Sequence, residues 1–506
     1  MKRMEPEAWE KQLTRLPLKE GGFSKELIQK VKERTEVEKI GGRKRSSWLR
    51  LSPVLAAAVL MAAGLTQQEA IGTLLTKLSK PQERMALEAM DKEKEQKLKV
   101  YYFHEDTFMA NYGKAFIIRY PNTDLEIVSH PNGPASSSGP SPEQLIEQRQ
   151  PDVLALTLEQ YERMASEGKL YALDAVMKQD RYDLQGLYSG LTEVLRDKGG
   201  GSLYGLAPQY NQRALFYNKE LFDKYGIPYP KDQMSWEELL QLAQRFPAAA
   251  EGDKLYGLTI GTAYDPMQLV QEAGRAKGLQ IIDDAGQQVT VNTPEWKQLY
   301  MQTMEAFRKG SLHLPEVIMG SITMEELYKK NPFIMGKAAM SLQTYSYVRS
   351  LEEAQNNYKL SAFPWELATE PVDPSRPKET TSFTVPTVYA VNAKSPNKRT
   401  AWELVKFIAS DEMARKMDSG SGSWGVPART GVLKTNEHRL EVFTMLKPAV
   451  PASPKNVPSS FYQSFNELAM QQSQAVLAGR KAVDAALKEL QEAGQQALVR
   501  AKAEAK

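Results

Sequence analysis

The sequence predicts an α/β fold that contains more than one compact unit. Short apolar runs typical of buried strands alternate with segments of helical periodicity, and three such runs are LKVYYF (98–103), LEIVS (125–129) and PDVLAL (151–156). This alternation favours a largely parallel sheet covered by helices. The chain has 506 residues, 42% of them hydrophobic and 25% charged, so it is globular and long enough for two or more cores.

Helix boundaries are marked by capping patterns. Ser235 and Glu238 have the spacing of a capping box, and so do Thr400 and Glu403. Thr293 precedes a proline, which is favoured at the first helical position. Each of these three predicted helices carries an apolar stripe with one tryptophan, which we expect in the core rather than in a binding site. These tryptophans are Trp236, Trp296 and Trp402.

Composition and motifs exclude several classes of function. The net charge of +3 gives no reason to expect a nucleic-acid partner, which needs a concentrated basic face. The chain has no cysteine, and its four histidines lack the spacing of metal ligands. No P-loop, GxSxG or GxGxxG motif stands between a strand and a helix. The residues therefore predict neither a cofactor nor an enzyme, although a pair of acids at the separation that glycoside hydrolysis needs cannot be recognised from sequence.

The N-terminal region predicts attachment to a membrane. Residues 1–47 are polar and end in a basic cluster, and the mostly apolar segment 48–65 follows. We interpret 48–65 as a transmembrane signal anchor, with 1–47 in the cytoplasm and the rest outside the cell. A cleaved signal peptide and a buried helix of a soluble protein are the alternatives. Residues 66–96 are charged and helix-prone, and we interpret them as a linker to a folded module over 97–506.

Several segments, in order, carry a resemblance to a known family. They are YGLAP and ALFYNKELFDKYGIP (204–228), FIMGKAAMSLQTYSY (333–347), YAVNAKSPNKRTAWELVKFIASDEMARKM (389–417), SGSWGVPAR (421–429) and VLAGRKAVDAALKELQEAGQQAL (476–498). Together they resemble the extracellular solute-binding proteins of ABC importers, in particular the family-1, sugar-binding type. The resemblance covers about residues 97–500. The lipid-modified cysteine common in this family is missing, because Leu65 occupies that position, and the first ~95 residues have no counterpart in the usual family member.

The resemblance implies a two-lobed, periplasmic-binding-protein-like (type II) fold with hinge-linked lobes, preceded here by the N-terminal helical and transmembrane segment. By analogy the first lobe comprises about 97–206 and 363–418, and the second comprises 207–362 and 419–506. The implied function is capture of a small solute, most readily a carbohydrate, in a cleft between the lobes. The implied partners are ABC permease subunits and their ATPase, and no nucleic acid, with the binding module on the extracellular face of the cell membrane.

Candidate solute contacts are polar and aromatic residues that follow the predicted strands, because sugars stack on aromatic rings and bond to polar side chains. For each one a structural role is the alternative: a packed hinge tyrosine at 210, loop packing at 365, and a solvated loop for the acids after the first strand. The candidates are Tyr210, Asn211, Tyr264, Asp265, Tyr345, Tyr347, Trp365, Trp424, Glu105 and Asp106.

Two further functions stay open at this point. The same module on a signal anchor could sense a ligand and relay its presence through residues 1–47 to a cytoplasmic partner. The cargo could also be a peptide or an ion, but that would require an acidic or basic cluster that the sequence does not place. The 22 tyrosines, against four histidines, favour an oligosaccharide over a metal.

Overall fold

A computed structural model describes most of the chain after residue 86. The chain divides into two compact units, 1–82 and 83–506, and all that follows concerns the second. The predicted cytoplasmic segment, the predicted transmembrane anchor and most of the predicted linker lie outside the described residues. Within the described ranges, no helix combines the length and apolar character that a membrane span requires. The described residues are 87–129, 140–247, 254–261, 265–315, 320–360, 362–419, 425–433, 438–449, 454 and 457–505.

The end of the predicted helical linker differs from the expectation. Residues 87–95 form no helix, and the first strand already begins at Gln96. The backbone of Leu87 is held by the Gln179 side chain, which donates to its carbonyl over 2.6 Å. The Asn122 amide donates to the carbonyl of Lys92 over 2.9 Å. These tertiary bonds replace the helical ones that the charged run favours locally.

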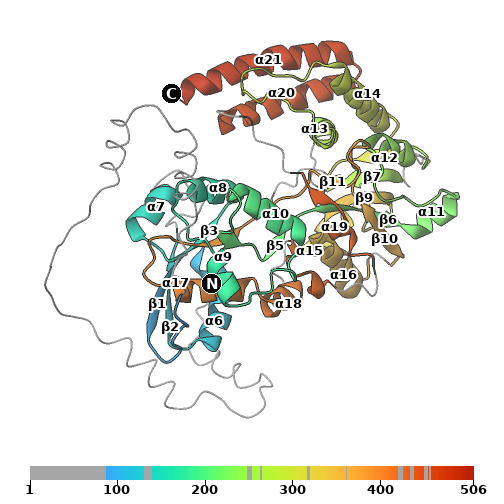
Figure 1. Cartoon of the computed structure of the whole chain (residues 1–506). Helices are drawn as coiled ribbons and strands as arrows, with labels where there is room; N and C mark the ends of the chain where they lie inside the picture. Colours follow the sequence, from blue (N-terminus) through green and yellow to red (C-terminus); the bar gives the residue numbers. More distant parts are fainter. Residues whose placement is uncertain are drawn as a thin grey trace, which may run out of the picture. The chain divides into compact units, whose positions relative to one another are not determined.

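The first lobe is a five-stranded sheet with helices around it (Figure 1). The strand order is β2-β1-β3-β12-β4, and only β12 runs antiparallel to its neighbours. All residues of β3 and β12 are buried, as expected for strands covered on both faces. The strands are β1 (Gln96–Tyr101), β2 (Thr123–Val128), β3 (Val153–Leu156), β4 (Gly205–Leu206) and β12 (Val388–Val391). The helices are α5 (Glu105–Phe108), the π-helix η1 (Met109–Gly113), α6 (Lys114–Arg119), α7 (Pro142–Arg149), α8 (Leu158–Ser166), α9 (Asp174–Gln179), α10 (Ser189–Lys198), α17 (Lys398–Ile408) and α18 (Asp411–Ser419).

The second lobe contains a second five-stranded sheet, of order β10-β6-β9-β7-β8. Its strand β6 is antiparallel to both neighbours, and β7 is parallel to β8 and β9. The strands are β6 (Arg213–Asn218), β7 (Tyr256–Ile260), β8 (Leu312–His313), β9 (Ala338–Thr344) and β10 (Trp365–Thr369). The helices are α11 (Lys219–Tyr225), α12 (Trp236–Ala243), α13 (Pro266–Ala276), α14 (Pro294–Arg308), α15 (Met324–Lys329), α16 (Ser346–Tyr358) and the C-terminal pair α20 (Ser459–Leu477) and α21 (Val483–Glu504).

The chain passes between the two sheets three times. The first crossing segment, residues 207–212, leads from β4 to β6; the second, 370–387, leads from β10 to β12; the third follows α18 and ends at α20. Two small sheets tie these crossings together, because β5 (Gln209–Tyr210) pairs with β13 (Val426–Pro427) and β11 (Glu379–Thr380) pairs with β14 (Lys447–Pro448). The 3-10 turn η2 (Thr430–Val432) and the short helix α19 (Val442–Met445) complete the third crossing.

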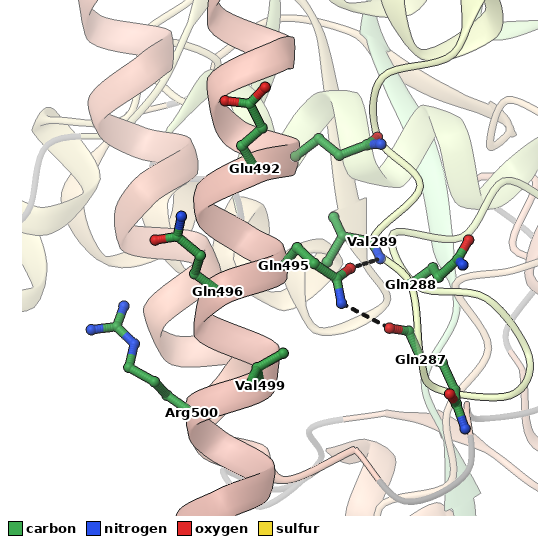
Figure 2. A pocket seen from close by; sticks show the side chains of 9 residues that line it. Gln287, Gln288, Val289, Glu492, Gln495, Gln496, Val499 and Arg500 are labelled. Carbon is green, nitrogen blue, oxygen red and sulfur yellow. Dashed lines mark hydrogen bonds between the residues drawn. The ribbon is translucent and has the colours of Figure 1, made fainter.

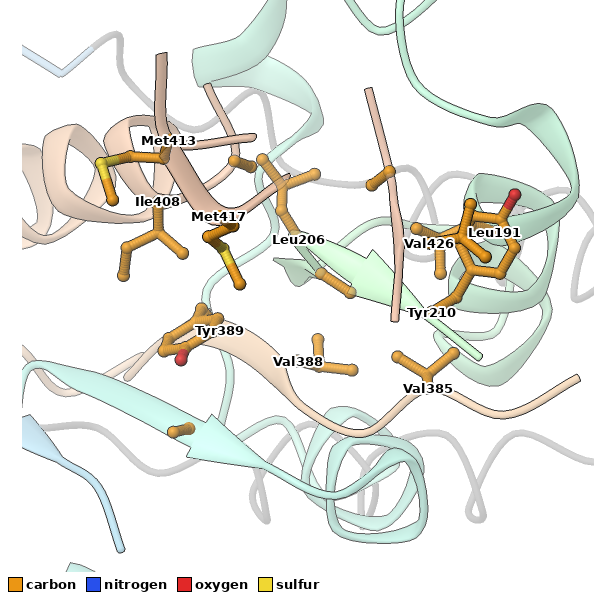
Figure 3. Packing of buried hydrophobic residues seen from close by; sticks show 14 of the residues in the cluster. Leu191, Leu206, Tyr210, Val385, Val388, Tyr389, Ile408, Met413, Met417 and Val426 are labelled. Carbon is orange, nitrogen blue, oxygen red and sulfur yellow. The ribbon is translucent and has the colours of Figure 1, made fainter. Parts of the chain in front are cut away.

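The apolar core of the first lobe continues into the crossings (Figure 3). Leu206, Tyr210 and Val426 belong to the same buried cluster as Tyr389 and Met417. A separate buried cluster lies between the second sheet, α12 to α14 and the C-terminal helix pair. The crossings are therefore packed protein interior rather than exposed linkers.

Most local predictions agree with the structure, with two corrections. Ser235 and Glu238 form the capping box of α12, Thr293 caps α14, and the three helix tryptophans are buried. Thr400, however, lies inside α17, which begins at Lys398, and Glu403 bonds to Arg399 instead of completing a cap. The charged, proline-rich region from 366 contains β10, which pairs with β6 of the second sheet. Residues 365–369 thus lie in the second lobe, although the resemblance assigned residues from 363 to the first.

Asp180, the residue after α9, accepts several hydrogen bonds from side chains of the first lobe. Its carboxylate is bonded by both Arg399 Nη atoms over 2.8 and 3.0 Å. Trp402 Nε1 and Lys406 Nζ each donate to it over 2.9 Å. Partial burial opposes ionisation, but the bonds from Arg399, Lys406 and Trp402 lower the pKa of Asp180 to about 2.

We expect Asp180→Asn to lower the free energy of unfolding by ~2 kcal/mol at neutral pH, because a carboxyl pKa depressed on folding stabilises the folded state. This contribution is present above the unfolded pKa near 4 and is lost as the pH falls through about 2. Urea unfolding should therefore show a smaller difference between variant and parent at about pH 3 than at about pH 7. Asp183→Asn, at an exposed carboxylate, is the control. Equal losses of unfolding free energy for both variants would contradict the stabilising role of the Asp180 carboxylate.

Candidate functional site

A pocket of about 870 Å³ opens at the carboxyl ends of three neighbouring strands, β7, β8 and β9. These strands are parallel, so their carboxyl ends meet at one edge of the sheet. Ligands of α/β proteins bind outside this edge, and the volume is typical of small-molecule sites. We call this the second-lobe pocket. It is lined by Thr259, Gly261, His313, Pro315, Leu327, Tyr328, Lys330, Asn331, Pro332, Ile334, Gln343, Tyr347 and Ser350.

Gln343 is one of the buried polar side chains of the pocket wall, together with Thr259. Gln343 stands near the end of β9 with 7% of its surface exposed, and its amide nitrogen donates to Ser341 Oγ over 3.0 Å. A Cβ at position 261 would lie only 2.2 Å from its Oε1, so the glycine at the end of β7 is what leaves room for this amide. The neighbouring Thr259 hydroxyl lies 3.4 Å from His313 Nδ1.

The opposite wall of the second-lobe pocket is held by Asn331. Its side-chain oxygen accepts from the backbone nitrogens of Phe333 and Ile334 over 3.0 and 3.2 Å. It also accepts from the Tyr347 hydroxyl over 2.9 Å. Tyr347 is one of the predicted contacts, and burial raises its pKa, so it stays a neutral donor. Tyr347 lines the pocket, but its hydroxyl donates to Asn331 and so holds the pocket wall in place.

Tyr210, predicted at the crossing, is fully buried at 0% exposure. Its hydroxyl donates to the Phe443 carbonyl over 3.0 Å, and its ring stacks on Tyr188 with centroids 4.8 Å apart. Phe383 of the second crossing lies 5.2 Å from the same ring. Tyr210 thus joins all three crossings, as the alternative reading of a packed hinge tyrosine requires.

The residues beside Tyr210 hold polar atoms without partners. Gln212 is fully buried, and neither its amide nitrogen nor its oxygen has a hydrogen-bond partner among the described residues. The side-chain oxygens of Gln209 and Asn211 also lack a hydrogen-bond partner among the described residues. Buried side-chain amides are normally hydrogen-bonded. Several atoms without a partner in a segment of four residues therefore require an explanation. These donors and acceptors lie where the chain passes from one lobe to the other.

Three more candidates are engaged within the protein, two through hydrogen bonds and one through ring stacking. The Tyr345 hydroxyl donates to Asp418 Oδ1 over 2.7 Å, a bond between the second lobe and α18 of the first. Asp265 is the N-cap of α13 and accepts from the backbone nitrogen of Met267 over 2.8 Å. Trp365 stacks on His438 with centroids 3.4 Å apart.

The remaining candidates are two exposed acids, the partly buried Asn211 and two residues outside the described ranges. Glu105 and Asp106 are exposed at the start of α5, just beyond the carboxyl end of β1, which is the ligand-facing edge of the first sheet. Asn211 lies against Gly425, because a Cβ there would be 2.8 Å from its Oδ1. Tyr264 and Trp424 lie outside the described residues.

The pocket residue Gln343 and the crossing residue Gln212 are absent from the predicted set, yet one signal was available. Ser341 and Gln343 alternate with apolar residues in the buried strand AAMSLQT. A polar side chain in a buried strand must find a partner, so it marks a position of interest. Gln212, next to Tyr210 and Asn211, gives no such signal in sequence because its burial depends on the other crossings.

Other features of the described residues carry no comparable chemistry. A larger hollow beside α21 is lined mainly by glutamines (Figure 2). There Gln495 accepts from the Val289 backbone nitrogen and donates to the Gln287 carbonyl, each over 2.9 Å. These two bonds attach segment 287–289 to the helix. Among the described residues, no group of three acidic or histidine side chains is placed to hold a metal ion.

Comparison with protein families matches this architecture. A family model described as bacterial extracellular solute-binding protein matches residues 143–442, more than half of the chain. Proteins of Brucella abortus and Brucella suis that carry the name of binding proteins are 25% identical over 294 residues. The match covers 57% of this chain and 66% of theirs, so the chain spans just under two thirds of the length of these relatives.

Solved structures share the fold across the described module. An extracellular solute-binding protein of family 1 from Alicyclobacillus acidocaldarius superimposes with a TM-score of 0.59 at 16% identity, covering 81% of this chain and 100% of that one. The sugar-binding protein MalE of Xanthomonas citri gives 0.57 at 16% identity over 80% and 98%. A sugar transporter of Rhizobium etli in an open conformation gives 0.55 at 20% identity over 79% and 99%.

Proposed function

Because this chain belongs to the bacterial extracellular solute-binding proteins, we propose that it captures an oligosaccharide between its lobes and delivers it to an ABC permease. The family and the fold are those of binding proteins, not of enzymes. A binding protein of this kind holds its solute by contacts from both lobes, so that closure is favoured when solute is present.

The observation that carries the proposal is the second-lobe pocket at the carboxyl edge of β7, β8 and β9. It combines apolar walls with a few fixed polar groups, which is the composition of small-molecule sites. Gln343 offers an amide that can both donate to and accept from sugar hydroxyls. Glu105 and Asp106, just beyond the carboxyl end of β1, stay candidate contacts together with Tyr264 and Trp424.

The first crossing segment supports the same site. The side-chain amide of Gln212 and the side-chain oxygens of Gln209 and Asn211 lack hydrogen-bond partners within the described residues. A solute lying over the crossing would supply hydroxyl groups to them, and satisfying buried polar groups is a source of affinity and specificity. The sugar-binding names of proteins with this fold favour a carbohydrate over a peptide or an ion.

The proposed partners are the permease subunits of an importer and their ATPase, with the binding module meeting the permease outside the cell. We retain the prediction that segment 48–65 anchors the chain in the membrane, with the binding module on the extracellular face. The missing lipid-modified cysteine makes this the simplest route of attachment.

A thermal-shift screen of the full chain against oligosaccharides tests the proposal. A ligand that binds only the folded state must raise the unfolding midpoint, so at least one saccharide should do so in a concentration-dependent manner. Gln343→Leu should lower the affinity for that saccharide about tenfold, because it removes a polar contact in the pocket. Gln496→Leu, in the hollow beside α21, is the matched control and should leave affinity unchanged. A response to peptides alone would overturn the proposal.

A further inference from the structure

The second-lobe pocket has an unbalanced charge. None of its thirteen described lining residues is an aspartate or a glutamate, whereas Lys330 contributes a full positive charge. Sites for neutral sugars use carboxylates to accept hydroxyl hydrogens, because a carboxylate is the strongest acceptor among side chains. In this pocket the amide oxygen of Asn331 already accepts three hydrogen bonds. What distinguishes the described lining is therefore the lack of a carboxylate beside the charge of Lys330.

Carboxylates on neighbouring helices offset the charge of Lys330 only in part. Glu326, four residues earlier, accepts from both the backbone nitrogen and the hydroxyl of Thr323 over 2.8 and 2.9 Å. The bonds from Thr323 lower the pKa of Glu326, and the charges of Lys329 and Lys330 lower it further. Glu353 accepts from the Tyr328 hydroxyl and from Arg349 Nε, each over 2.8 Å. Within the described ranges, no ion pair of Lys330 is present, whereas the adjacent Lys329 pairs with Glu325 over 2.6 Å.

The first turn of α16 adds to this positive potential. Tyr347 of this turn and Ser350 just after it line the pocket, and the helix extends over 13 residues from Ser346. Its first turn contains no acidic residue, and no side chain caps its amino end. The amino end of a helix carries partial positive charge and unpaired backbone N–H groups, which favour an anion nearby. This contribution strengthens the one made by Lys330 and Gln343.

We propose that the second-lobe pocket holds the carboxylate of an acidic sugar, so that the solute is an oligosaccharide containing a uronic acid. This inference rests on the proposed function and narrows it to a substrate class. Lys330 supplies the charge that pairs with the solute carboxylate, and Gln343 donates a hydrogen bond from a buried, fixed position. A neutral sugar in the same place would offer Lys330 only neutral acceptors, whereas a carboxylate forms the stronger, charge-assisted hydrogen bond.

Isothermal titration of the full chain tests the inference with two matched sets of probes. One contains oligomers of galacturonate, glucuronate, mannuronate and guluronate, and the other contains the uncharged oligosaccharides of the same linkage and length. We expect the acidic member of at least one pair to bind tenfold or more tightly, since hydrogen bonds to charged groups discriminate by about this factor. Its affinity should also fall as salt is added, because salt screens the exposed charge of Lys330.

Two adjacent lysines give the decisive comparison. Lys330→Gln should lose about tenfold in affinity for the acidic oligosaccharide and most of its salt dependence, whereas Lys329→Gln removes the same charge outside the pocket and should change neither. Lys330→Glu should weaken acidic binding further. Equal binding of acidic and neutral probes, or equal effects of the two Gln variants, overturns the inference while leaving sugar capture in place. Failure of every saccharide overturns the proposed function as well.

Discussion

Replacing Arg213 with methionine is expected to destabilise the protein by about 3–5 kcal/mol, the typical result of leaving a buried carboxylate without its partner. Arg213 begins β6, directly after the first crossing segment, and its guanidinium pairs with Glu272 of α13. Its Nε lies 3.6 Å from Glu370, which is only 2% exposed. Methionine keeps most of the apolar volume of the side chain, so the main loss is the charge.

The carboxylate of Glu370 links Arg213 to the second crossing. It accepts from the hydroxyls of Thr380 and, over 2.6 Å, Ser382, and the backbone nitrogen of Arg213 donates to the same Ser382 hydroxyl over 3.0 Å. One ionic group therefore connects two of the three crossings. This is why we expect its removal to loosen the hinge as well as to lower stability.

The loss should depend on pH in a defined direction. Burial raises the pKa of Glu370, and the nearby Arg213 opposes that rise. Without the arginine the pKa rises further, so the folded variant holds a proton that the unfolded chain has already released. Its stability then falls as the pH rises above the unfolded pKa near 4.5, and the variant should be less impaired at about pH 5 than at about pH 8.

Urea unfolding at both pH values measures the effect. Adding Glu370→Gln to the Arg213→Met variant should recover part of the loss and flatten its pH dependence, because no buried charge then remains at position 370. The control is Arg119→Met, which breaks a surface pair with Glu412 and should cost less than about 1 kcal/mol. Similar losses at positions 213 and 119 would show that the hinge pair contributes no special stability.

The local part of the fold could be predicted from sequence because its determinants are local. Ser235 with Glu238 caps α12 through bonds within three residues, and Gly226 ends α11 in the left-handed conformation at φ 60°. The order of strands and helices, together with the family resemblance, indicated the two lobes. The error at Thr400 is of the same kind, since its capping pattern is real in sequence but Asn397 starts the helix first.

The candidate site was harder to predict because it depends on contacts between distant segments. Trp365 looked like part of a loop, but its strand pairs with β6, which lies about 150 residues earlier in the chain. Gln343 owes its place to a glycine on a neighbouring strand. The lack of carboxylates in the described lining of the second-lobe pocket depends on which segments meet there, and no spacing rule reveals that.

Tyr210 offers the clearest test of a binding residue against a hinge residue. We expect Tyr210→Ala to cost about 3–5 kcal/mol, because it removes a large, fully buried ring that packs on Tyr188 and Phe383. Tyr210→Phe should cost only about 1 kcal/mol, the value of the single hydrogen bond to the Phe443 carbonyl. Tyr225→Ala, at an exposed ring, is the control for stability and should have little effect.

The phenylalanine variant separates the two roles, because it keeps the hinge packing and removes only the hydroxyl. That hydroxyl already donates to the protein, so a solute gains nothing from it as a donor, and solute affinity should stay within about twofold of the parent. Calorimetry with the saccharide that responds in the screen measures this, with Gln343→Leu as the variant that does weaken binding. If Tyr210→Phe weakens binding tenfold at unchanged stability, the tyrosine contacts the solute. The neighbouring side chains of Gln209, Asn211 and Gln212 must then be assigned as solute contacts too. If affinity holds while the unfolding midpoint falls, the ring belongs to the hinge. The Gln212 amide and the side-chain oxygens of Gln209 and Asn211 then remain the polar atoms of the crossing that lack a partner within the described residues.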